Sequence, residues 1–356
     1  MQMSSSKRTS VLSSTPIDDI FAHGILSTIG NTPLIRLRRS VLHLPFRVFA
    51  KLEGFNPGGS IKDRAAACMI AGALKRNEIT ARTTVVESSS GNLGIGLAQI
   101  CRCLGLEFIC VVDPKTTAQN IALLRSYGAR IELVDKPDPS SGDFLAARLN
   151  RVTELLRSLP DAYWPNQYAN LDNARAHHTT MKEIVSCLRG QVDYILCPTS
   201  SCGTIRGCAE YVRNEGLSTR VWAVDAVGSV IFGLQAGKRL LPGHGSARRP
   251  ELLKMDLIDR CLHVTDLDCV MGCRRILCEE ALLVGGSSGG TFMALQAALD
   301  DIPRDANCVL IFPDRGERYL DTIFSDQWIR EHFGSAAASF NEDGESRAEN
   351  LPVFSD

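Results

Sequence analysis

The sequence predicts an α/β protein with largely parallel sheets, arranged in two domains. Strand-like runs alternate with helical patterns along most of the chain, at intervals typical of parallel β–α–β units. The length of 356 residues suggests two domains or one large one. A hydrophobic content of 44% with 22% charged residues is normal for a globular protein that buries a sizeable core.

The first half of the chain contains five strand-like runs separated by helical patterns. The runs are short, apolar and bounded by turn residues, whereas the helices have longer apolar periodicity. The predicted strands are Leu34–Leu37, Arg47–Glu53, Thr83–Glu87, Leu106–Val112 and Arg130–Val134. The predicted helices are Ile17–Leu26, Ile61–Leu74, one that ends near Leu104, Thr117–Tyr127 and Asp143–Leu159.

The second half repeats this alternation without repeating the sequence. The predicted strands are Tyr194–Pro198, Arg220–Asp225 and Cys308–Pro313. The predicted helices are Ala174–Leu188, Ile205–Asn214, Ile276–Leu283 and one that follows Gly290. Residues 1–16 are predicted to form a flexible arm, and residues 334–356 a disordered tail because they are polar and lack periodicity.

Charge and cysteine usage exclude several classes of protein. A net charge of −1 does not favour nucleic acid or a membrane surface as a partner, and no run approaches the ~20 apolar residues of a membrane span. The thirteen cysteines are scattered, which indicates reduced thiols in a cytoplasmic protein. Cys269, Cys273 and Cys278 are close in sequence, but no histidine follows at ligand spacing, so no metal site is predicted.

The stretch Gly54–Arg64 joins a turn to a helical pattern. Asn56 to Gly59 has the composition of a turn, and Ser60 is placed to be the N-cap of the helix. Lys62 then lies at a helix N-terminus, where the helix dipole disfavours its positive charge. The position predicts a reactive amine with a lowered pKa, although the local pattern alone fits an ordinary surface lysine at least as well.

Three strand–turn–helix junctions carry small polar residues: Ser88–Gly94, Ser200–Thr204 and Gly285–Gly290. Such turns direct backbone N–H groups and a positive helix end toward anions, although β–α turns are often rich in Gly and Ser for geometric reasons alone. Nucleotide motifs do not fit, because no GxGxxG follows an early strand and Gly233–Arg239 is one residue short of a P-loop. Together with the lysine, the turns match pyridoxal 5'-phosphate (PLP) bound as a Schiff base.

Several motifs resemble the cysteine synthase/cystathionine β-synthase family of fold-type II PLP enzymes. The resemblance extends from about Ile25 to Ile323. The motifs are Gly30–Leu34, Asn56–Arg64, Ser90–Asn92, Asn166–Tyr168, Ser200–Thr204, Gly286–Gly289 and Pro313–Tyr319. The family implies a tryptophan synthase β-like fold of two three-layer αβα domains. Residues 17–53 and 161–333 would form the large PLP-binding domain, and residues 54–160 a small mobile domain that closes over the substrate.

The resemblance implies a role for each matching position. Lys62 would form the internal aldimine and shuttle the α-proton, and Asn92 would bind the ring hydroxyl of PLP. Ser287 would face the pyridine nitrogen as a neutral hydroxyl, which weakens the electron sink and favours β-elimination over racemisation. The phosphate would be held by Ser200, Ser201, Cys202, Gly203 and Thr204. The substrate carboxylate would be held by Ser89, Ser90 and Gln167.

Departures from plain cysteine synthases point to a specialised branch. Leu93, Ser201, Tyr168 and Arg315 replace residues typical of those enzymes, although each replacement alone could be neutral. Together they resemble the synthases that join O-phospho-L-serine to L-glutamate, giving N-(2-amino-2-carboxyethyl)-L-glutamate and phosphate through an aminoacrylate. That product is a precursor of 2,3-diaminopropionate in siderophore biosynthesis.

The leaving phosphate needs cationic or hydroxyl partners. Tyr168, Ser201 and Arg148 are candidates, although Arg148 fits a solvated helix face equally well. His177 and His178 are predicted to be a helix-surface pair rather than catalytic residues.

Two other functions stay open from the sequence. One is a cysteine synthase that uses sulfide on O-acetylserine or O-phosphoserine. The other is an inactive PLP-binding regulatory partner, which the intact Lys62 and Asn92 disfavour. The family also implies a homodimer.

Overall fold

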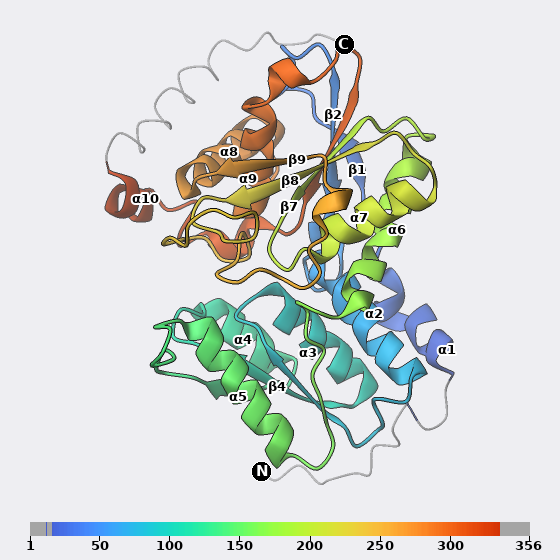
Figure 1. Ribbon diagram of the computed structural model, residues 1–356, viewed down its shortest axis with the longest axis vertical. Coiled ribbons are helices and arrows are strands. Elements are labelled where there is room, and N and C mark those ends of the chain that lie inside the picture. Colours follow the sequence, from blue (N-terminus) through green and yellow to red (C-terminus); the bar gives the residue numbers. More distant parts are fainter. Residues whose placement is uncertain (1–11, 13–15, 335–356) are drawn as a thin grey trace.

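The chain folds into two lobes, each built on its own sheet (Figure 1). The computed structural model describes residue 12 and residues 16–334. The larger sheet has the strand order β1-β2-β10-β7-β8-β9, and the smaller has the order β5-β4-β3-β6. Most of the predicted arm, and all of the predicted tail except Gly334, lie outside the described residues.

The larger sheet is parallel except at its edge, where β1 pairs antiparallel with β2. Helices on both faces bury it, as in other parallel sheets. Its strands are β1 (Leu34–Arg36), β2 (Arg47–Leu52), β7 (Tyr194–Pro198), β8 (Arg220–Ala226), β9 (Arg260–Val264) and β10 (Asn307–Phe312). Helices α6 (Leu171–Cys187) and α7 (Gly203–Asn214) pack on one face, and α8 (Asp266–Glu280), α9 (Gly286–Gln296) and α10 (Asp326–Phe333) on the other.

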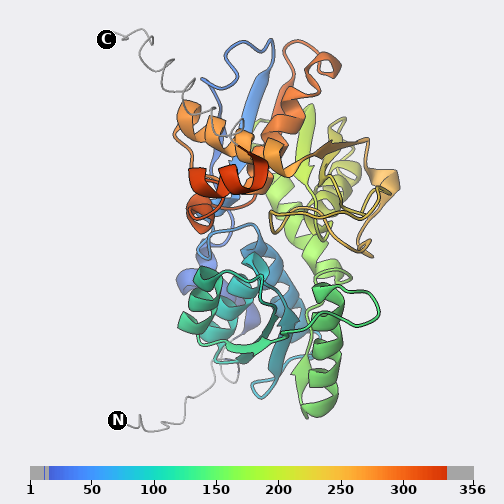
Figure 2. The ribbon, with the colours of Figure 1, turned by 90° about the vertical axis from the view of Figure 1, so that its left-hand side faces the viewer.

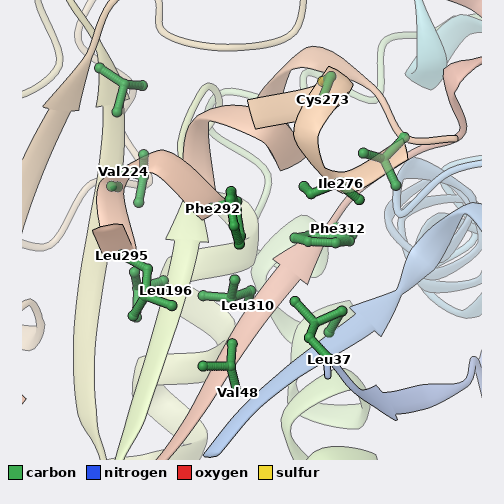
Figure 3. Packing of buried hydrophobic residues seen from close by; sticks show 14 of the residues in the cluster. Leu37, Val48, Leu196, Val224, Cys273, Ile276, Phe292, Leu295, Leu310 and Phe312 are labelled. Carbon is green, nitrogen blue, oxygen red and sulfur yellow. The ribbon is translucent and has the colours of Figure 1, made fainter. Parts of the chain in front are cut away.

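Strand β10 shows why both faces of this sheet are apolar. Leu310 and Phe312 point into the cluster that contains Phe292 of α9 (Figure 3). Val309 and Ile311 belong to the other cluster, beneath α6 and α7. Alternate side chains of one strand therefore serve two cores.

The smaller sheet is entirely parallel. Its strands are β3 (Thr84–Ser88), β4 (Glu107–Val112), β5 (Arg130–Leu133) and β6 (Ala162–Tyr163). One apolar cluster joins it to α1 (Ile17–Ala22), α2 (Lys62–Lys75), α3 (Asn92–Leu104) and α4 (Ala118–Ser126), and a second joins it to α5 (Phe144–Ser158). Figure 2 shows the two lobes one above the other.

The predicted fold class is confirmed, but some elements differ from the prediction. Helix α8 begins at Asp266 rather than Ile276, because Thr265 forms a capping box with Asp268. Strand β9 was not predicted, because its half-exposed sequence lacks a clear apolar pattern. Helix α2 begins at Lys62 with Ile61 as its N-cap, so the prediction of Ser60 as N-cap is wrong; the Ser60 hydroxyl still accepts from the Lys62 N–H at 3.2 Å.

Among the described helices, none combines the length and the apolar character that a membrane span requires. All thirteen cysteines are free thiols, and Cys187 and Cys278 are the exposed ones.

Candidate active site

Lys62 lies at the first residue of α2, beside the turn that follows β7. Its Nζ is 3.5 Å from the hydroxyl of Ser201. Burial lowers the pKa of Lys62 to about 8, although the charges of Cys202 and Asp314 oppose that shift. The amine therefore has a larger neutral, nucleophilic fraction at neutral pH than an ordinary lysine.

A buried network of charges holds the loop in front of Lys62. Arg64 binds Glu53 and Glu183 at 2.7 Å each, and the fully buried Lys51 donates to Glu183 at 2.6 Å. Asn56 donates to Glu53 and accepts from the backbone of Gly30. Sequence reasoning missed this network, although charged residues inside the apolar strand around Ala50 were a signal for it.

Asp63 fixes the same loop from the other side. Its carboxylate accepts from the Gly58 N–H at 2.5 Å, and a Cβ at Gly58 would lie 2.5 Å from its Oδ1. Only glycine therefore fits at position 58. Burial raises the pKa of Asp63 to about 7.

The turn Ser200–Thr204 leaves the N-terminus of α7 open. Its N-cap, Cys202, has a left-handed φ of 62° and makes no side-chain cap. A Cβ at Gly203 would lie 2.2 Å from Oδ1 of Asn173, so glycine is required where α6 meets this turn. Asn173 also donates to Ser201 at 3.2 Å. Uncapped N–H groups beside two serine hydroxyls suit a phosphate.

His177 corrects one prediction from the sequence. It is fully buried, and its Nε2 lies 3.3 Å from the hydroxyl of Thr204, whereas only His178 is partly exposed, 3.3 Å from Glu210. The pair is therefore not a surface pair. Burial and the nearby Lys62 charge hold the pKa of His177 well below its usual value, so its ring is a neutral support for Thr204.

Asn92 begins α3 and faces two residues of the segment after β10. Its Nδ2 donates to Asp314 at 2.7 Å, and its Oδ1 accepts from Arg318. An amide nitrogen has two hydrogens, so one remains for a ring hydroxyl. Burial raises the pKa of Asp314, which also accepts from the Tyr319 hydroxyl at 2.7 Å. Sequence reasoning gave Asp314 and Arg318 no role, and their place within a motif was the available signal.

Ser287 lies in the first turn of α9, near Asp314. The N-cap of α9, Gly285, has no side-chain cap, and a Cβ there would lie 2.0 Å from Oδ1 of Asp314. Ser287 is 9% exposed, and its backbone oxygen accepts from the Thr291 hydroxyl at 2.8 Å, whereas its own hydroxyl makes no hydrogen bond within residues 16–334. Its hydroxyl is therefore available to a ligand. Asp314 thus connects the turn Gly285–Gly290 to Asn92.

In the turn after β3, the Ser89 hydroxyl is bonded to the protein backbone, unlike the hydroxyl of Ser287. Ser89 accepts from the Gly94 N–H at 2.9 Å, so its side chain caps α3. The backbone oxygen of Ser90 accepts from Asn120, and that of Gln167 accepts from Asn173 at 2.7 Å. Asn173 therefore links Gln167 to Ser201, because its side chain donates to both residues.

Arg148 does not lie on a solvated face. Its side chain is only 11% exposed, and its Nε is 3.2 Å from the carboxylate of Asp113. Its charge acts on Tyr168, whose pKa is raised mainly by burial. Arg148 and Tyr168, two of the candidate partners of the leaving phosphate, are therefore close enough for the arginine charge to act on the tyrosine hydroxyl.

Two of the departures from plain cysteine synthases lie elsewhere. Leu93 is 2% exposed and packs in the apolar core of the smaller lobe. Arg315 has a side chain that is 59% exposed and pairs with Glu317. Neither side chain is brought together with Lys62.

Comparison with known proteins places these residues in a family. Residues 25–314 match the model of pyridoxal-phosphate-dependent enzymes. The chain is 46% identical over 319 residues to N-(2-amino-2-carboxyethyl)-L-glutamate synthase of Ralstonia nicotianae, covering 89% of this chain and 94% of that protein.

Two solved structures share the fold. A hydrogen sulfide-producing enzyme from Fusobacterium nucleatum matches with a TM-score of 0.78 and 31% identity, covering 84% of this chain and 98% of that one. An O-acetylserine-dependent cystathionine β-synthase from Helicobacter pylori matches with a TM-score of 0.77 and 31% identity, covering 84% and 97%.

The site fits the cofactor of this family. A lysine with a lowered pKa, an uncapped helix N-terminus, an amide with a spare hydrogen and a free serine hydroxyl supply one donor set for each polar part of PLP. The chain is a PLP-dependent enzyme of β-replacement, and it belongs to the pyridoxal-phosphate-dependent enzyme family, in the cysteine synthase/cystathionine β-synthase group that its motifs resemble.

Proposed function

We propose that the protein joins O-phospho-L-serine to L-glutamate, giving N-(2-amino-2-carboxyethyl)-L-glutamate and phosphate. The observation that carries this proposal is the 46% identity, over nearly the full length of both chains, to a synthase named for that product. The neighbours of Lys62 support the donor: Ser201 lies 3.5 Å away. A hydroxyl there, together with the guanidinium of Arg148 and the hydroxyl of Tyr168, suits a leaving phosphate better than a leaving acetate.

The residues divide between the cofactor and the substrates in this proposal, and Ser201 serves both. Bound PLP withdraws electrons from the α-carbon of the donor. Lys62 removes the α-proton and returns one at the end of the cycle, which its lowered pKa favours. Ser200 to Thr204 and the N-terminus of α7 hold the cofactor phosphate, Asn92 its ring hydroxyl and Ser287 its ring nitrogen.

The substrate is held from both lobes. Ser90, Gln167 and the backbone of the Ser89 turn bind the donor carboxylate. Arg148, kept in place by Asp113, and Tyr168 bind the leaving phosphate together with Ser201. The Ser89 hydroxyl itself serves α3.

The test pairs two donors with two acceptors. Purified holoenzyme is given O-phosphoserine or O-acetylserine, with glutamate or sulfide, and both phosphate release and product mass are followed. We expect product only from phosphoserine with glutamate. Efficient use of sulfide with glutamate ignored would overturn the proposal and identify a cysteine synthase.

A homodimer, closure of residues 54–160 over the substrate and a place in siderophore biosynthesis stay predictions from family resemblance, and a cytoplasmic location stays a prediction from the scattered cysteines. Size-exclusion chromatography with light scattering tests the first of these directly.

A further inference from the structure

Tyr168 lies among arginines that the reaction scheme above does not use. Besides Arg148, the charges of Arg239 and Arg248 act on its hydroxyl. Both come from the long segment between β8 and β9, in the larger lobe. The guanidinium of Arg248 lies over the ring of Tyr168, 5.4 Å from its centroid.

Backbone contacts hold this segment against the site. The Leu252 N–H donates to the oxygen of Tyr168 at 3.2 Å, and the Gly245 N–H donates to the oxygen of Thr199 at 2.8 Å. Thr199 directly precedes Ser200, so the segment contacts both the tyrosine turn and the turn proposed to bind phosphate. The two arginines are thus positioned by fixed backbone.

These arginines are less neutralised than Arg148. Arg148 has the buried Asp113 at 3.2 Å. Among the described acids, Arg248 pairs only with the exposed Glu251 at 4.0 Å, and such a pair is worth little in water. Arg239 donates to the backbone oxygen of His244 at 3.0 Å, and its buried Nε has no partner within the described part of the chain. The charge of Glu87 also acts on Tyr168, but burial raises the pKa of that carboxyl to about 7. The larger-lobe side of Tyr168 therefore carries excess positive charge.

We propose that Arg248 and Arg239 bind the side-chain carboxylate of the second substrate, an amino acid with an acidic side chain. This inference rests on the proposed function and adds the site of the acceptor to it. The leaving phosphate of the donor has its own partners in Arg148, Tyr168 and Ser201, so a further cationic group beyond Tyr168 fits a second anion. Sulfide has no carboxylate and needs no such group.

The experiment compares glutamate with glutamine as acceptors, because glutamine has the same shape without the charge. In Arg248→Gln holoenzyme we expect the kcat/KM preference for glutamate over glutamine to fall about tenfold or more, through KM for glutamate. Arg239→Gln is expected to act in the same direction. Arg248→Lys keeps the positive charge but loses the planar guanidinium. Its kcat/KM preference for glutamate over glutamine should therefore lie between those of Arg248→Gln and the wild type.

Two readouts separate this site from the donor site. The phosphate released by phosphoserine before any acceptor is added should be unchanged in Arg248→Gln, as should the thermal midpoint. Arg213→Gln, an exposed change at the end of α7, is the matched control and should match the wild type throughout.

Each possible result decides the question. If both variants keep the wild-type preference for glutamate, or if they slow phosphate release instead, the acceptor site is wrong. If the wild-type enzyme itself makes no product from glutamate, the proposed function fails first and this inference falls with it.

Discussion

The turns after β3 and β7 have the same architecture but serve their helices differently. After β3, the N-cap Gly91 makes no side-chain cap, but the Ser89 hydroxyl accepts from the Gly94 N–H, so the protein itself satisfies one N–H group in the first turn of α3. After β7, the N-cap Cys202 makes no side-chain cap, and the neighbouring Ser201 hydroxyl faces Lys62 and Asn173. A helix start that the chain leaves uncapped within a buried site is prepared for an anionic ligand, because unsatisfied buried N–H groups are costly.

The two turns also differ in how tightly glycine is required. At Gly203 a Cβ would collide with Asn173, whose side chain is fully buried. At Gly91 a Cβ would meet no atom within 4 Å. The phosphate turn is therefore closely packed from behind, while the turn after β3 has room. This fits a rigid cofactor cradle opposite a turn that can adjust to substrate.

The largest expected effect comes from the lysine that faces the β7 turn. Lys62→Ala removes the amine that carries the covalent bond and the proton transfer, so turnover should fall at least about 10²–10⁴-fold. Borohydride treatment followed by mass spectrometry should attach the cofactor to the wild type and not to the variant. Cofactor attached equally well to the variant would mean that another lysine holds PLP.

Gly203→Ala and Gly91→Ala test the difference in packing directly. The first should displace Asn173 and weaken PLP binding by about tenfold or more, since overpacking a buried site costs about 1–3 kcal/mol. The second should leave PLP binding unchanged. Both are measured by fluorescence titration of apoprotein with PLP. Equal effects of the two substitutions would remove the distinction between the turns.

The pH dependence of PLP uptake tests whether burial lowers the pKa of Lys62. Burial disfavours the charged amine, so the folded protein loses this proton at about pH 8 rather than near 10.4. Because only the neutral amine attacks PLP, the uptake rate by apoprotein should rise about tenfold per pH unit below 8 and level off above it. Lys62→Ala apoprotein supplies the background. A rate that keeps rising to pH 10 would mean an ordinary lysine.

The sequence predicted the fold class and the position of each turn, because glycines, helix starts and apolar runs are local signals. It could not predict what lies behind the turns. Asn173 and His177 reach Ser201 and Thr204 from α6, and Asp314 reaches Asn92 from beyond β10, through tertiary contacts only.

Polarity misled the sequence analysis in both directions. His177 reads as a surface residue by its polarity but is fully buried, while Arg315 reads as a site residue by its motif but points to solvent. In both cases the orientation of one helix or turn decides the position, and the sequence carries that information only weakly.

The smallest expected effect separates the two serines. Ser89→Ala removes a helix cap and should lower the free energy of unfolding by about 1 kcal/mol, with PLP affinity unchanged. Ser201→Ala removes no cap, so its main effect should be on phosphate release from phosphoserine. Urea denaturation of both apoproteins and phosphate assays of both holoenzymes measure the two effects. If Ser201→Ala destabilised the apoprotein as much as Ser89→Ala does, the hydroxyl after β7 would be a structural cap like its counterpart, and the contrast between the turns would disappear.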